Sequence, residues 1–172
     1  DDDLSRGLGD VYKRQEDQLQ LTQNTQPSIL TVSFSIFKVL KEEFNFDFST
    51  FKYFAGHSLG EYSALVCSDS LKFEDAIYLL HERGKAMQEA VPVGKGSMLA
   101  VLGAKIKDIN DLLNSFKDKG VCEIANDNAD GQVIISGDKD TIISFQSLLK
   151  EKKIKSIPLK VSAPFHCSLM KP

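Results

Sequence analysis

Residues 51–65 read FKYFAGHSLGEYSAL, an aromatic run followed by a serine between two glycines and then by helix-compatible residues. The short aromatic segment 52–55 is typical of a buried strand, and residues 59–67 favour a helix. Gly56, Ser58 and Gly60 fall at the turn between them, which is the strand–turn–helix setting of a nucleophile elbow. The stretch therefore predicts an α/β fold with a serine held at a sharp turn.

The glycines beside Ser58 have a physical reason in such a turn. The serine backbone is strained so that Oγ projects outward, and side chains at 56 and 60 would collide with the neighbouring strand and helix. The next amides along the chain lie at a helix N-terminus, where the helix dipole helps them to stabilise an oxyanion. A G-x-S-x-G pattern alone is weak evidence, but these predicted flanks favour a nucleophilic Ser58 over a plain turn.

A nucleophilic serine needs a base, and the chain has three histidines. His57 adjoins Ser58, so its ring is expected to point away and pack beneath the turn. His81 lies in the middle of a predicted helix among charged residues, which is typical of a solvated surface. By elimination His166 is the best candidate base, and Cys167 beside it is expected to be a bystander.

The regions on either side of the serine turn alternate between predicted helices and strands. Residues 27–44 favour a helix that starts at Gln26-Pro27, because proline fits the first turn. Leu30, Phe34 and Phe37 recur at helical spacing within it. A second helix is predicted over residues 75–90, ended by Val91-Pro92.

The second half of the chain has a different rhythm. Its predicted order is strand, helix, strand, turn-rich segment, strand, helix and strand, over residues 97–102, 106–116, 121–125, 126–131, 132–136, 141–150 and 154–159. This βαββαβ order is typical of a ferredoxin-like unit.

Composition narrows the function classes. The 172 residues carry a net charge of −3 without a Lys/Arg block, so nucleic acid is not expected as a partner. No apolar run approaches the roughly 18 residues of a membrane-spanning helix, and no metal-ligand spacing stands out. The three cysteines are widely spaced and are predicted to be free thiols, which favours a reducing compartment such as the cytoplasm.

The first 15 residues, DDDLSRGLGDVYKRQ, differ in character from the rest of the chain. The last six of them resemble the translation of a transposon end used in preparing sequencing libraries. We therefore expect residues 1–15 to be a non-native scar that carries no information about the fold.

Four segments resemble the malonyl-CoA:acyl carrier protein transacylase family in order and spacing. They read TQPSILTVSFSIFKVL, AGHSLGEYSALVCSDSLKFEDAIYLLHERGKAMQEAVP, GQVIISG and SAPFHCSLMKP. The resemblance covers the chain from about Leu19 to its end, and several independent motifs agree. It implies an α/β-hydrolase-like large subdomain, partial here over residues 16–96 and resumed at 162–172. A ferredoxin-like small subdomain is inserted over residues 97–161.

The resemblance also implies a ping-pong reaction and a role for each site residue. Ser58 would attack malonyl-CoA while His166 takes its proton, and the phosphopantetheine thiol of acyl carrier protein would then accept the malonyl group. Arg83 matches the arginine that pairs with the malonyl carboxylate, which suits the bidentate guanidinium. The Leu59 amide would be an oxyanion donor, and Phe165 would narrow the pocket against branched malonyl groups. A monomer without cofactor or metal, acting away from membranes in fatty acid biosynthesis, is expected.

The chain departs from the family pattern at both ends. The family's first glycine/glutamine-rich turn and its final strands are not found here, so we expect an internal fragment that is inactive by itself. Two other functions stay open: a serine esterase or thioesterase, which would not need the carboxylate clamp of Arg83, and an inactive carrier-protein-binding module derived from an acyltransferase. A domain of a larger synthase is also compatible with the sequence.

Overall fold

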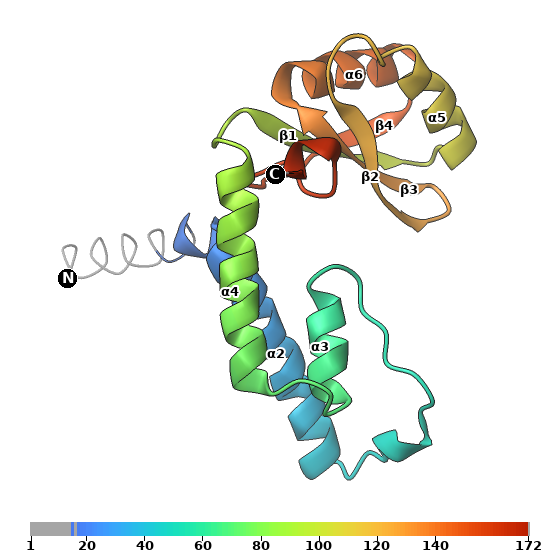
Figure 1. Cartoon of the computed structure of the whole chain (residues 1–172). Coiled ribbons are helices and arrows are strands. Elements are labelled where there is room, and N and C mark those ends of the chain that lie inside the picture. The colour runs from blue at the N-terminus through green and yellow to red at the C-terminus, as the bar shows by residue number, and fades with distance from the viewer. Residues whose placement is uncertain (1–14, 16, 172) are drawn as a thin grey trace, which may run out of the picture. The chain divides into compact units, whose positions relative to one another are not determined.

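A computed structural model of the chain describes residue 15 and residues 17–171. The predicted scar lies outside the described residues except for its last position. The chain divides into two compact units, the first ending at Lys85 and the second starting at Ala86. Figure 1 shows the helices and strands of each unit.

The first unit is built from helices. They are α2 (Thr22–Glu42), the short 3-10 helix η1 (Phe48–Thr50), α3 (Gly60–Cys67) and α4 (Phe73–Ala90), whose last turn belongs to the second unit. The three predicted α-helices are thus confirmed. Leu30, Val66, Ala76 and Leu80 are buried in one cluster, and Phe34 packs on it and stacks on Phe73 at a ring-centroid distance of 5.0 Å. The apolar face predicted for residues 27–44 is therefore the face that α2 buries.

Two predictions of secondary structure are wrong in this unit. The helix does not start at Pro27, because α2 begins five residues earlier at Thr22 and keeps Pro27 inside it. Residues 52–55 form no strand, and Tyr53 is 86% exposed. A strand is stabilised by a partner with which it exchanges hydrogen bonds, and among the described residues segment 52–55 has no such neighbour.

The second unit follows the predicted order of strands and helices. It contains β1 (Gly96–Leu102), α5 (Ile106–Asn114), β2 (Cys122–Ala129), β3 (Gln132–Asp138), α6 (Lys139–Glu151), β4 (Lys155–Pro158) and the 3-10 helix η2 (Ser168–Met170). The strands form one antiparallel sheet in the order β2-β3-β1-β4. Only the turn-rich segment 126–131 was misplaced: β2 runs on to Ala129, with register shifts against β3 that absorb the extra residues.

Alternating side chains give this sheet two buried faces. One face packs against α5 and α6 through a cluster that includes Leu99, Ile135 and Phe145 (Figure 1). The other face carries Met98, Ala100 and Ile134. Among the described helices, none is long and apolar enough to cross a membrane.

Candidate active site

The serine turn has the strained backbone predicted for it. Ser58 has φ of 54°, in the left-handed region that non-glycine residues seldom adopt. A Cβ on Gly56 would lie 1.8 Å from the carbonyl oxygen of Gly60, so this position requires glycine. The prediction that a side chain at position 60 would also collide is wrong, because a Cβ on Gly60 meets nothing within 4 Å in the described chain.

The turn leads directly into α3, with Leu59 as its N-cap residue. The Gly60 amide donates to the His57 carbonyl at 2.8 Å, and the Glu61 amide donates to the Ser58 carbonyl at 3.2 Å. Both bonds close the turn and consume those two amides. The Leu59 amide is not a donor in either bond, and it lies at the positive end of the α3 dipole.

Arg83 of α4 reaches the serine. Its Nη2 donates a hydrogen bond to Ser58 Oγ at 3.0 Å, and its Nη1 donates to Gln26 Oε1. Gln26 is buried on α2 and its Nε2 donates to Thr22 Oγ1 at 2.9 Å. A guanidinium directed at the serine oxygen gives the site a fixed positive charge that suits an acyl group bearing a carboxylate.

Gln26 contacts the candidate site through Arg83 and was not among the residues predicted for it. Its signal was present in TQPS, but Gln26-Pro27 was interpreted only as a helix start. The Arg83–Gln26 bond joins residues 57 positions apart. Local periodicity carries no information about such a pairing.

A cavity of about 460 Å³ lies beside the serine turn within the first unit. Its lining is mostly apolar and includes Ile29, Phe37, Phe54 and Leu59. His57 also lines it and is exposed, so the prediction that this ring packs beneath the turn is wrong for the described chain.

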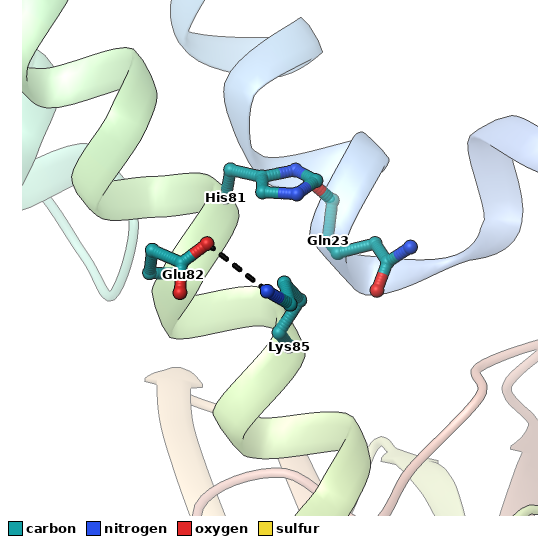
Figure 2. Close-up of polar contacts among 4 residues, drawn as sticks. All are labelled: Gln23, His81, Glu82 and Lys85. Carbon is teal, nitrogen blue, oxygen red and sulfur yellow. Dashed lines mark hydrogen bonds and ion pairs between the residues drawn. The ribbon is translucent and has the colours of Figure 1, made fainter.

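His81 is also not the solvated surface residue that was predicted. Its ring is half-buried, and Nδ1 lies 3.0 Å from the Gln23 carbonyl oxygen of α2 (Figure 2). On the same helix, Glu82 and Lys85 form a partly buried ion pair of 3.2 Å.

His166 and Phe165 lie in the second unit, on the segment after β4. His166 is exposed and has φ of 58°, so a second left-handed residue occurs at a predicted catalytic position. Phe165 packs against Met98, Ala100 and Ile134, on the sheet face that α5 and α6 do not cover.

Contacts on both sides of His166 fix this segment. The buried Pro164 ring covers Gly96, where a Cβ would lie 2.2 Å from Pro164 Cγ. After the histidine, the Ser168 amide and Oγ donate to the two carboxylate oxygens of Glu123 on β2 at 2.7 and 2.6 Å. Buried Cys167 donates its Sγ hydrogen to the Pro164 carbonyl at 3.2 Å, and its interpretation as a bystander stays a prediction.

Two cysteine thiols are shifted toward the neutral form. Burial, with a smaller contribution from the Glu123 charge, raises the pKa of Cys122 to about 12. Burial and nearby Asp69 also raise the pKa of Cys67. Neither thiol is activated as a nucleophile. No group of three or more residues able to hold a metal ion occurs among the described residues.

The structure thus brings Ser58 and Arg83 together within the first unit, with Leu59 at the same turn. His166 and Phe165 belong to the second unit. A family model described as an acyl transferase domain matches residues 7–172. The chain belongs to this acyl transferase family.

Individual relatives of this acyl transferase chain agree with the family match. It is 41% identical over 165 residues to the malonyl CoA-acyl carrier protein transacylase of Bacillus subtilis, covering 94% of this chain and 50% of the relative. It is 44% identical over 163 residues to the enzyme of the same name from Haemophilus influenzae, with 94% and 52% covered. The chain therefore spans about half the length of the curated relatives it matches.

Solved structures of malonyl-transacylases also resemble the acyl transferase chain. The malonyl CoA-acyl carrier protein transacylase of Coxiella burnetii gives a TM-score of 0.84 at 39% identity, covering 91% of this chain and 49% of that one. A malonyl-transacylase in complex with a type II PKS acyl-carrier protein gives a TM-score of 0.82 at 39% identity, covering 90% and 50%. Mixed α/β architecture is therefore shared with malonyltransferases.

Proposed function

We propose that the chain carries the nucleophile of a malonyl-CoA:acyl carrier protein transacylase. The observation that carries this proposal is the 3.0 Å hydrogen bond from Arg83 Nη2 to Ser58 Oγ. A serine at a strained turn is common to many acyl-transferring enzymes, but an esterase or thioesterase for uncharged acyl groups has no need of a guanidinium beside it. The names of the relatives point to the same substrate class.

The reaction proceeds in two half-reactions on Ser58. Its Oγ attacks the thioester carbonyl of malonyl-CoA as His166 takes the hydroxyl proton, the carbon–sulfur bond breaks, and His166 returns the proton to the CoA sulfur. The phosphopantetheine thiol of acyl carrier protein then attacks the malonyl ester by the reverse sequence of proton transfers. The Leu59 amide donates to the oxyanion in both half-reactions.

Arg83 and Phe165 select the acyl group in this proposal. The guanidinium forms a fork with the malonyl carboxylate once substrate displaces its bond to Ser58, and Gln26 keeps it oriented. Because the carboxylate is charged in substrate and transition state alike, Arg83 contributes to selectivity more than to chemical rate. Phe165 narrows the site against branched malonyl groups.

The same proposal includes the finer architecture. The sheet order β4-β1-β3-β2 with both helices on one face supports a ferredoxin-like small subdomain over residues 97–161. The elbow geometry of Ser58 supports an α/β-hydrolase-like large subdomain over residues 16–96 and 162–172. The protein would act as a cytoplasmic monomer with malonyl-CoA and acyl carrier protein as its partners.

Mass spectrometry tests the nucleophile. The chain completed to the length of its relatives is exposed briefly to malonyl-CoA and digested, and the malonyl adduct is expected on the Ser58 peptide. Ser58→Ala should carry none there. An adduct retained in the variant would contradict the assignment.

Substrate preference tests the clamp. Arg83→Ala is expected to reduce preference for malonyl-CoA over acetyl-CoA by about 2–5 kcal/mol, the cost of leaving a desolvated carboxylate unpaired. Lys85→Ala is the matched control, because Lys85 is a cation on the same helix that pairs with Glu82. Unchanged preference in Arg83→Ala would show that another residue binds the carboxylate.

A further inference from the structure

A proline inside α2 leaves one main-chain carbonyl without its usual partner. Pro27 is the sixth residue of α2, and a proline has no N–H to donate to the carbonyl four residues before it. That carbonyl belongs to Gln23. An acceptor left unsatisfied in a partly buried position lowers the free energy of unfolding by about 1–3 kcal/mol, so a substitute donor would stabilise the fold by a similar amount.

His81 provides the substitute donor. Its Nδ1 lies 3.0 Å from the Gln23 carbonyl oxygen, across 58 residues of chain, and Figure 2 shows the ring extending from α4 to the main chain of α2. A carbonyl oxygen can only accept, so Nδ1 must carry the proton in this contact. The nearby Glu82 and Lys85 pair with each other and leave the ring to this role.

The same turn of α4 makes two further contacts with the first turns of α2. Gly84 is buried so closely that a Cβ there would lie 2.4 Å from the Gln23 Cα. Between it and His81, Arg83 donates to Gln26 and to Ser58 Oγ. The carbonyl contact, the close approach and the guanidinium therefore lie within four consecutive residues.

We infer that His81 is a positioning residue that replaces the hydrogen bond missing at Pro27 and thereby holds Arg83 in register with Ser58. Sliding α4 along α2 would separate His81 from the Gln23 carbonyl, to which Pro27 has no N–H to donate, whereas an apolar contact would tolerate such a shift. The link to substrate selection rests on the proposed function. The link between His81 and Pro27 does not.

The first test reads the proton directly. In two-bond ¹H–¹⁵N correlation spectra of this chain at pH 8.5, where an ordinary imidazole is neutral, His81 is expected as the Nδ1–H tautomer. Exposed His57 serves as the internal comparison. An Nε2–H tautomer at His81 would overturn the inference.

The second test is a double-mutant cycle. His81→Phe keeps a ring but loses the donor, and it is expected to raise the opening constant of α2 amides in native-state hydrogen exchange about tenfold. In a Pro27→Ala background the new Ala N–H serves the Gln23 carbonyl, so the same change should have less than about a twofold effect. Equal effects in the two backgrounds, or none in either, would overturn the inference.

The third test measures selectivity in the chain completed to the length of its relatives. His81→Phe should reduce the preference for malonyl-CoA over acetyl-CoA about tenfold, while His81→Gln, which keeps a donor, and the His81→Phe/Pro27→Ala pair should retain most of it. Glu82→Gln on the same turn is the control expected to change nothing. Absence of any malonyl transfer would refute the proposed function but leave the spectra and the exchange cycle as tests of the His81 contact, whereas unchanged selectivity in an active His81→Phe enzyme would refute the positioning role.

Discussion

The two units of the chain bury apolar side chains in different ways. The second unit has nine buried residues in one cluster beneath a four-stranded sheet in which every strand pairs with its neighbour in the order β2-β3-β1-β4. The cluster of the first unit has four, and many of its large apolar side chains are exposed, among them Ile29, Val32, Ile36, Phe44, Phe46, Phe51 and Tyr53. In the second unit, every strand pairs with another strand of the same unit and the core is formed by the unit's own side chains. In the serine-bearing unit, many large apolar side chains are exposed to solvent in the described chain.

Hydrogen exchange of the whole chain should show this difference most strongly. Amides of the central strands β1 and β3 should exchange at least about a thousandfold more slowly than those of residues 52–57, which are exposed and lie outside helices and strands. Residue-resolved exchange by NMR measures both sets in one sample. Comparable protection would mean that the first unit is as well ordered in solution as the second.

Aromatic truncations sharpen the comparison. Phe145 is fully buried in the second unit and contacts Phe116 edge-on at 5.2 Å, so Phe145→Ala should lower the free energy of unfolding by about 3–5 kcal/mol. Tyr53→Ala in the first unit, where the ring is 86% exposed, should change it by less than about 0.5 kcal/mol. Urea unfolding monitored by far-UV circular dichroism gives both values. A large loss in Tyr53→Ala would show that this ring is covered in solution.

The same difference explains which elements could be predicted from the sequence. The βαββαβ order was correct because periodicity and turn residues are local signals, and every strand that they indicate finds its neighbour within 86–172. Residues 52–55 carry the composition of a strand, but composition provides no partner. Pro27 was interpreted as a helix start from its local preference alone, whereas α2 begins at Thr22 and its first turns contact His81, Arg83 and Gly84 of another helix.

In the candidate site, too, the features that depend on local sequence were predicted from the residues, and those that depend on packing between helices were not. The strained backbone of Ser58 was predicted from the residues and is observed, whereas the predicted need for glycine holds at Gly56 and fails at Gly60 in the described chain. Arg83 was selected only through the family resemblance, and Gln26 was missed, since both depend on the packing of α4 against α2. The contact between Ser58 and Arg83 is observed, but the roles of Ser58, Arg83, His166, Leu59 and Phe165 all remain predictions.

The reactivity of a cysteine thiol in each unit reports how far that thiol is buried. Cys122 in the second unit has its pKa raised to about 12, and Cys67 in the first unit also has a raised pKa. At pH 8 iodoacetamide should label Cys122 at least about tenfold more slowly in the folded chain than in urea, because the thiolate is the reactive species. Labelling of folded Cys122 at the unfolded rate would contradict the burial of this thiol.

The shift also sets a direction for stability. The unfolded thiol ionises near pH 8.5–9 while folded Cys122 keeps its proton, so its contribution is fully present below that range and is lost as the pH rises toward about 12. Between pH 8 and pH 10.5, the midpoint of urea unfolding should therefore decrease more in the parent chain than in Cys122→Ala. An equal fall in both proteins would assign the alkaline loss to other groups.

The smallest expected effect concerns the carboxylate that secures the His166 segment to the sheet. Glu123 accepts from both the amide and the hydroxyl of Ser168, two residues beyond the left-handed His166, and this contact is solvent-exposed. Glu123→Ala should make the Ser168 amide exchange about twofold to tenfold faster, as expected for one net hydrogen bond. Glu151→Ala, which removes an exposed carboxylate at the end of α6, is the matched control. Because Pro164 and Phe165 anchor the other side of His166 on the sheet, the exchange of the Ala163 and Phe165 amides should stay unchanged. Loosening of the whole segment in Glu123→Ala would instead show that this one side chain holds the histidine loop in place.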